Sequence, residues 1–162
     1  MITSTDSSCI LCLDFDGVTH PEPCQTDKLF CHLDRIEIVL RDFPSVEIVI
    51  SSSWREEFGL GDLRAYFSPD IARRVVDVTP SIKQPSSTWL PGQDACYARE
   101  WECNSWMRLN RAWGTPWLAI DDRAHWFGPD CANLLLTNAR TGFTVEDQIT
   151  LRTMLYERVV AG

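Results

Sequence analysis

Several features that mark other classes of protein are missing from this sequence of 162 residues. No apolar run approaches the roughly 20 residues that a membrane-spanning helix needs, so we expect no membrane partner. The N-terminus lacks the basic start and apolar stretch of a signal peptide, and we therefore expect a cytoplasmic protein. Internal repeats and low-complexity segments are absent as well, so residues 1–162 are expected to form a single domain.

A basic stripe, the usual sign of a nucleic-acid-binding surface, is also lacking. The net charge is −8 and the isoelectric point is near 4.8, which favours a small or locally held phosphate substrate over a long polyanion. A local basic mouth remains open as an alternative, because arginines gather in the middle of the chain at Arg64, Arg73, Arg74, Arg99, Arg108 and Arg111.

The seven cysteines are scattered and lack the grouping of a zinc site. Cys9 and Cys12 have a C-x-x-C spacing, but they lie within an apolar segment rather than on a loop. A zinc site would need a second close pair of cysteine or histidine, and the sequence offers none. We therefore expect buried, reduced thiols.

Apolar segments alternate with helical patterns along the chain, which is typical of an α/β protein. The apolar segments predict strands at about 8–14, 46–51, 74–78, 116–121 and 132–137. The helical patterns predict helices at 32–42, 60–67, 94–112 and 144–159, the last with a capping box of Thr144 and Asp147. We expect a three-layer, Rossmann-like parallel sheet of about five strands. The connections are too short for a separate cap domain, so the site should be open to a bulky substrate.

Two carboxylates, Asp14 and Asp16, follow the first apolar segment and are separated by a single residue. Alternation along an extended chain points their side chains the same way. Two anions held that close repel each other unless a cation joins them. Mg²⁺ suits such a cluster, because it prefers oxygen ligands and leaves positions for water and a phosphate. This pattern indicates phosphoryl chemistry.

Two further strands end in polar groups. The second ends in Ser51-Ser52-Ser53-Trp54-Arg55, and the fourth ends in Asp121-Asp122-Arg123, after a helix that carries Arg99. Sheets of this class bind ligands in the crevice beyond the carboxyl ends of their strands. The topology therefore predicts one crevice that holds an acidic nucleophile, a hydroxyl group, a cation and a second acidic pair.

The order of these segments resembles the haloacid dehalogenase-like (HAD) superfamily of phosphohydrolases. Four motifs carry the resemblance: Asp14-Phe15-Asp16-Gly17, Ser51, Arg99, and the pair Asp121-Asp122. More narrowly, Leu-Asp-Phe-Asp-Gly-Val-Thr-His-Pro and Ile-Ser-Ser-Ser-Trp-Arg look like the small bacterial HAD-domain proteins, some of which are linked to RNA repair. Asp-Asp-Arg also resembles the fourth motif of polynucleotide 3′-phosphatases and deoxyribonucleotidases.

The resemblance implies a magnesium-dependent phosphatase in which Asp14 attacks the phosphorus and forms an aspartyl-phosphate. Asp16 would protonate the leaving oxygen and later activate the water. The resemblance also implies that Mg²⁺ is held by the Asp14 carboxylate, the Asp16 backbone carbonyl and Asp122, while Asp121 orients the water ligands of the metal; the reverse assignment of Asp121 and Asp122 stays open. Phosphate contacts would come from Ser51, with Ser52 beside it, and from Arg99, while Arg55 is either a second phosphate clamp or a surface arginine.

Several alternatives stay open. Lys83 competes with Arg99 for the third motif, because the superfamily more often uses lysine there. The substrate is a phosphorylated small molecule or a nucleic-acid end, with a nucleotide or nucleic-acid end favoured. Other functions are a catalytically weak HAD-like module that binds phosphate or a partner, and a receiver-like phospho-acceptor domain. The position of Asp14 on the first strand argues against the receiver, which carries its acceptor on a middle strand.

Overall fold

The computed structural model describes residues 9–82 and 97–162, which form a parallel five-stranded sheet. The strands are β1 (Ile10–Leu13), β2 (Glu47–Ile50), β3 (Val75–Val78), β4 (Trp117–Asp121) and β5 (Leu134–Leu136). Their order in the sheet is β3-β2-β1-β4-β5, and every neighbouring pair is parallel. The predicted Rossmann-like α/β fold is thus confirmed, with β1 at the centre.

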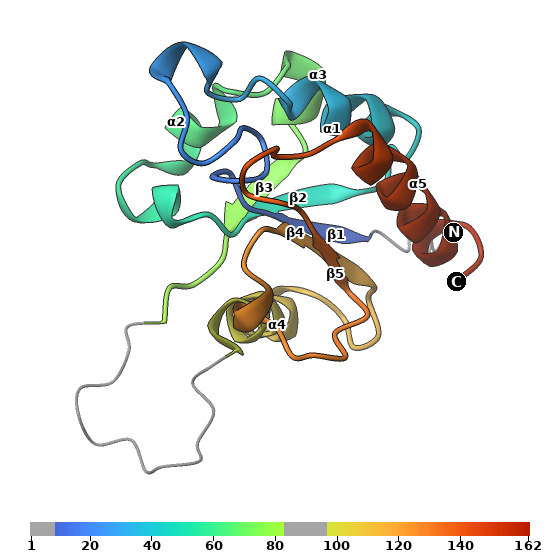
Figure 1. The fold of residues 1–162 in the computed structure, drawn as a ribbon. Coiled ribbons are helices and arrows are strands. Elements are labelled where there is room, and N and C mark those ends of the chain that lie inside the picture. Colours follow the sequence, from blue (N-terminus) through green and yellow to red (C-terminus); the bar gives the residue numbers. More distant parts are fainter. Residues whose placement is uncertain (1–8, 83–96) are drawn as a thin grey trace.

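Helices cover both faces of the sheet (Figure 1). On one face lie α1 (Leu33–Arg41), α5 (Val145–Val159) and two short helices, α2 (Leu60–Arg64) and α3 (Pro69–Ala72), while α4 (Ala98–Asn110) covers the other. Between the strands, residues 9–82 and 97–162 contain these helices and single helical turns but no cap domain. None of the helices in the described part of the chain is long and apolar enough to cross a membrane.

The apolar run of β1 is uninterrupted because both of its faces are buried. Leu11 and Leu13 point into the core beneath α1 and α5, whereas Ile10 and Cys12 point into the core beneath α4. Cys9 and Cys12 are buried free thiols, and burial raises the pKa of Cys9 to about 12. This central, dry strand gives the residues that follow it a rigid support.

Helix α5 begins with the capping box that the sequence predicted. Thr144 Oγ1 accepts a hydrogen bond from the Asp147 backbone at 3.2 Å, and Asp147 Oδ2 accepts one from the Thr144 backbone at 2.8 Å. These contacts satisfy two amide groups that have no partner within the helix.

We expect Thr144→Ala to lower the free energy of unfolding by about 1 kcal/mol, because it removes the cap acceptor. Urea denaturation monitored by circular dichroism measures this change. Thr153→Ala is a matched control on the same helix: the Thr153 hydroxyl is exposed and donates to a carbonyl within the helix. A loss for Thr144→Ala no larger than that for Thr153→Ala would contradict the role of the cap.

The structure corrects two predicted helices. The helix expected over 60–67 ends at Arg64, because Ser68 and Pro69 begin the separate helix α3, with proline in its first turn. The helix expected over 94–112 is seen from Ala98 to Asn110, where the chain becomes extended at Arg111. Residues 94–96 and the alternative third-motif residue Lys83 lie outside the described residues.

Candidate active site

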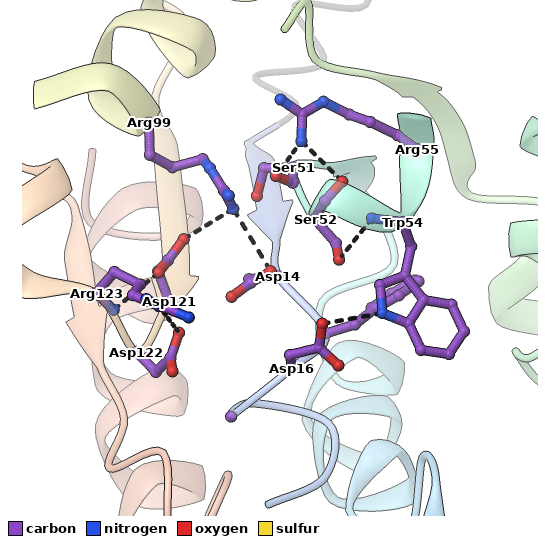
Figure 2. Close-up of polar contacts among 12 residues, drawn as sticks. Asp14, Asp16, Ser51, Ser52, Trp54, Arg55, Arg99, Asp121, Asp122 and Arg123 are labelled. Carbon is purple, nitrogen blue, oxygen red and sulfur yellow. Dashed lines mark hydrogen bonds and ion pairs between the residues drawn. The ribbon is translucent and has the colours of Figure 1, made fainter. Parts of the chain in front are cut away.

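The register of the three central strands places three polar residues at one edge of the sheet. Leu13 pairs with Ile50 of β2 and with Ile120 of β4, so the next residues in these strands, Asp14, Ser51 and Asp121, form one row. Asp122 follows Asp121, and Arg99 reaches the row from the first turn of α4. Figure 2 shows Asp14 between Arg99 and the acidic pair on one side and Ser51 and Asp16 on the other.

Three carboxylates gather at the centre of this edge. Oxygen atoms of Asp14, Asp121 and Asp122 all lie within 4.8 Å of one another, a spacing that allows a shared metal ion. Asp14 is only 5% exposed. Burial, and then the neighbouring Asp121 carboxylate, raise the pKa of Asp14 well above its usual value, and burial raises the pKa of Asp121 to about 6. When all three carboxyl groups are ionised, the positive charge around the cluster is therefore too small to compensate them.

Arg99 is the buried cation at this cluster; the more exposed Arg123 also lies near it, with its Nε atom 3.9 Å from Asp122 Oδ1. The Nη1 atom of Arg99 lies 3.0 Å from Asp121 Oδ2 and 3.5 Å from Asp14 Oδ1, and its Nε atom lies 3.4 Å from Glu102 Oε2. The last contact is the pair across one helical turn that fixes the guanidinium, as the spacing of the two residues allows. The single positive charge of Arg99 cannot neutralise the three carboxylates of the cluster.

Two polar atoms of the site are buried without a hydrogen-bond partner. They are Asp122 Oδ1 and Ser51 Oγ; Thr79 Oγ1 is the third such atom among the described side chains. An unpaired buried polar group costs about 1–3 kcal/mol, so these atoms point to ligands that satisfy them. A carboxylate oxygen suits a hard divalent cation, and a hydroxyl group suits a phosphoryl oxygen. The residues present thus fit Mg²⁺ and phosphate.

Gly17 is required by the close approach of Asp122. Its φ of +73° is left-handed, and a Cβ atom there would lie 2.3 Å from Asp122 Oδ2. The Gly17 carbonyl accepts a hydrogen bond from Thr137 Oγ1 at 2.7 Å. This bond ties the loop after β1 to the end of β5, so Thr137 holds the loop in place.

Asp16 lies at the mouth of the site, with its carboxyl group 36% exposed. His20 Nε2 is 2.9 Å from one carboxyl oxygen, and Trp54 Nε1 is 3.0 Å from the other. The hydrogen bond from His20, together with that from Trp54, lowers the pKa of Asp16. Sequence reasoning did not assign this role to His20 or Trp54; the spacing of four residues from Asp16 to His20 is the only local signal for it.

Arg55 is neither the phosphate clamp nor the surface arginine that we expected. Its guanidinium is buried and donates to the backbone carbonyls of Ser51, Ser52 and Thr79 at 2.7–3.1 Å. It also pairs with Glu102 at 2.8 Å. Its donors are taken up by protein oxygens, so Arg55 braces the end of β2 and does not face the acidic cluster (Figure 2).

Ser52 also differs from its expected role at the phosphate. It is fully buried, and its Oγ atom accepts a hydrogen bond from the Trp54 backbone at 3.3 Å. This contact caps the helical turn Ser53–Glu56. Ser51 has the buried hydroxyl at this strand end that lacks a hydrogen-bond partner, and Ser53 lines the cavity over the cluster.

A small cavity of about 30 Å³ opens over the cluster, lined by Asp14, Asp16, Glu22, Ser53, Arg99, Asp122, Arg123 and Trp126. A larger hollow of about 400 Å³ lies at the other end of α4, around Arg108 and Trp113. That hollow contains none of the three carboxylates of the cluster, so choosing the site by cavity volume alone would give the wrong place. Charge and unpaired buried atoms identify the smaller cavity.

Comparison with known proteins agrees with this geometry. No match was found among curated proteins or among solved structures. Residues 10–148 match the sequence family described as "HAD domain in Swiss Army Knife RNA repair proteins", and this range contains every residue of the acidic edge. Because the match covers most of the chain, the protein belongs to this HAD domain family, whose activity is of the phosphohydrolase type.

Proposed function

We propose that this protein is a Mg²⁺-dependent phosphatase that hydrolyses a phosphomonoester through an aspartyl-phosphate on Asp14. The favoured substrates are a nucleotide or a nucleic-acid end, in keeping with the RNA-repair proteins of the family. The observation that carries the proposal is the acidic cluster together with two buried atoms that lack a hydrogen bond, Asp122 Oδ1 and Ser51 Oγ.

The metal would be held by the carboxylates of Asp14 and Asp122 and by the backbone carbonyl of Asp16. Asp121 is less available, because one of its oxygens pairs with Arg99 at 3.0 Å and the other accepts from the Arg123 backbone at 2.9 Å. These contacts support Asp122 as the ligand of the fourth motif. The chemistry that bound Mg²⁺ supplies is charge neutralisation between the Asp14 carboxylate and the phosphoryl oxygens.

The side chains around Asp14 suit an attack on phosphorus. Arg99 and the Ser51 hydroxyl would hold the phosphoryl oxygens, while Asp14 forms a bond to phosphorus and the bond to the leaving oxygen breaks. Asp16, at the mouth of the cavity, would give a proton to that oxygen; because its pKa is lowered in the free protein, it would have to take up this proton when the negatively charged phosphate binds beside it. Hydrolysis of the aspartyl-phosphate by a water molecule, with Asp16 as base, then releases phosphate and restores Asp14.

A phosphate-release assay tests this function. The panel contains p-nitrophenyl phosphate, nucleoside monophosphates, and oligonucleotides with a 3′- or a 5′-phosphate, each with Mg²⁺ and with EDTA. We expect Mg²⁺-dependent release from at least one class, and the preferred class identifies the substrate. No hydrolysis of any phosphomonoester in this panel would refute the proposal and favour a phosphate-binding module.

The raised pKa values of Asp14 and Asp121 predict how metal binding depends on pH. In the metal-free protein, carboxyl groups with raised pKa values lower the folding stability as the pH rises from about 4 through about 6, because the folded state must then hold unfavourable charges. A metal ion needs the ionised groups and offsets that loss.

We therefore expect the increase in Tm on adding Mg²⁺ to be small near about pH 5 and larger near about pH 7.5. Thermal denaturation with Mg²⁺ and with EDTA measures it at each pH. Asp122→Asn is expected to reduce the increase at the higher pH, whereas Asp130→Asn, outside the cluster, should leave it unchanged. A Mg²⁺ effect of equal size at both pH values would contradict the assignment.

A further inference from the structure

We propose that His20 positions Asp16 as a neutral imidazole that donates its Nε2 proton, and that this positioning matters most for substrates whose leaving oxygen must be protonated. The proposal rests on the proposed phosphatase function. It gives a role to a buried histidine that lies in the Leu-Asp-Phe-Asp-Gly-Val-Thr-His-Pro stretch but outside the four motifs of the superfamily.

The hydrogen bonds around His20 assign its tautomer. The Phe30 backbone amide, which can only donate, lies 3.2 Å from His20 Nδ1, so this nitrogen must accept. The Thr19 hydroxyl also lies 3.1 Å from this nitrogen. It can donate its proton to the Phe15 carbonyl, likewise at 3.1 Å, so its position does not decide the tautomer. The proton of a neutral ring is therefore on Nε2, which faces Asp16 Oδ1 at 2.9 Å.

An unusual backbone conformation places the Phe30 amide at His20. Phe30 has a φ of +60°, a left-handed value that is uncommon for residues other than glycine. Such strain persists only where the surroundings enforce it. Here the Phe30 ring stacks on Tyr66 at 4.0 Å and meets the edges of Phe15 and Trp54 at 5.0 and 5.4 Å. The aromatic packing thus maintains the contact that fixes the tautomer.

Trp54 holds the second oxygen of the same carboxyl group. Its Nε1 atom donates to Asp16 Oδ2 at 3.0 Å, as Figure 2 shows. Two donors, one on each oxygen, fix the carboxyl plane, and each oxygen keeps a further lone pair that can carry a proton. His20 itself is 1% exposed and cannot reach a substrate, so its effect must pass through Asp16.

The need for a well-oriented proton donor depends on the leaving group. A sugar alkoxide is strongly basic and must be protonated as its bond to phosphorus breaks, whereas p-nitrophenolate leaves without a proton. The value of kcat/KM reports the steps through the formation of the aspartyl-phosphate, so it reflects this first proton transfer. A misplaced Asp16 should therefore impair a nucleoside monophosphate far more than p-nitrophenyl phosphate.

The experiment measures kcat/KM for both substrates with Mg²⁺ in the wild type, His20→Leu, His20→Gln and Trp54→Phe. We expect His20→Leu to lower the value for the nucleoside monophosphate by roughly 10- to 100-fold, with a much smaller change for p-nitrophenyl phosphate. His20→Gln should recover much of the loss, because its side-chain amide can donate. Trp54→Phe should show the same selective loss, because it removes only one donor. His125→Leu, at an exposed histidine, is the control.

Equal losses on both substrates in His20→Leu would mean that His20 is only structural and would overturn the proposal. A measurement that needs no turnover is the ¹⁵N NMR spectrum of the histidine rings, in which His20 should show the Nε2–H tautomer at neutral pH. An Nδ1–H or a doubly protonated ring would also overturn it. If the wild type hydrolyses neither substrate, the phosphatase function and the leaving-group effect fail together, while the NMR result still decides the contact with Asp16.

Discussion

Asp14→Asn is expected to abolish phosphate release and, at the same time, to make the metal-free protein more stable at neutral pH. The amide cannot attack phosphorus, so turnover should fall to the background of the assay. Stability should rise because the substitution removes a buried carboxylate whose pKa is raised by burial and by Asp121. We expect a gain on the order of 1 kcal/mol, or about 2–4 °C in Tm for a chain of this size.

Opposite signs in the two measurements make this variant informative. Phosphate release measures the first effect, and thermal denaturation with EDTA measures the second. Asp130→Asn, at an exposed residue outside the cluster, is the control and should change neither. Retained turnover in Asp14→Asn would remove Asp14 as the nucleophile. Lower stability in that variant would show that the ionised Asp14 carboxylate does not destabilise the folded protein.

Arg99→Met is expected to have the largest effect on stability. It removes the cation that lies within 3.5 Å of Asp14 and Asp121, whereas Glu102 keeps its pair with Arg55. Removing one partner of a buried ion pair costs about 3–5 kcal/mol, because the remaining charge has no compensation. Turnover should be lost as well, since Arg99 would hold the phosphoryl oxygens.

Urea denaturation at neutral pH measures this loss, and Mg²⁺ should restore part of it by supplying positive charge to the same cluster. Arg108→Met, on the exposed face of the same helix, should change the stability by no more than about 0.5 kcal/mol. If Arg99→Met is too unstable to purify, adding Asp121→Asn should recover a folded protein. A metal-free Arg99→Met variant as stable as the wild type would contradict the electrostatic role of Arg99.

The positions of the strands along the chain and their parallel direction could be predicted from the sequence because they follow from general rules. A short, continuous apolar segment indicates a buried parallel strand, and the polar residues that follow such strands meet at one edge of the sheet. This is why Asp14, Ser51 and Asp121 could be expected together before any coordinates. The contact of Arg99 with Glu102 could be expected for a similar reason, since positions one turn apart on a helix are neighbours.

The roles of Arg55, Ser52 and His20 could not be predicted, because they depend on where backbone groups lie in three dimensions. Arg55 bonds to carbonyls of Ser51, Ser52 and Thr79, and no sequence pattern shows which carbonyls lack a partner. His20 depends on the amide of Phe30, ten residues later and in a left-handed conformation. From the sequence, Ser52 is expected beside the phosphate, and Arg55 is expected as a phosphate clamp or a surface residue.

The position of β1 at the centre of the sheet divides the acidic edge between two parts of the chain. The first part, through β3, contains Asp14, Asp16 and Ser51, whereas Arg99, Asp121 and Asp122 belong to α4 and to β4 with its following residue. During synthesis Asp14 therefore emerges from the ribosome well before Arg99, Asp121 and Asp122. A nascent or truncated chain that ends before β4 would contain the proposed nucleophile but not the other two carboxylates of the acidic cluster, so the proposed site can form only when the second part docks against β1.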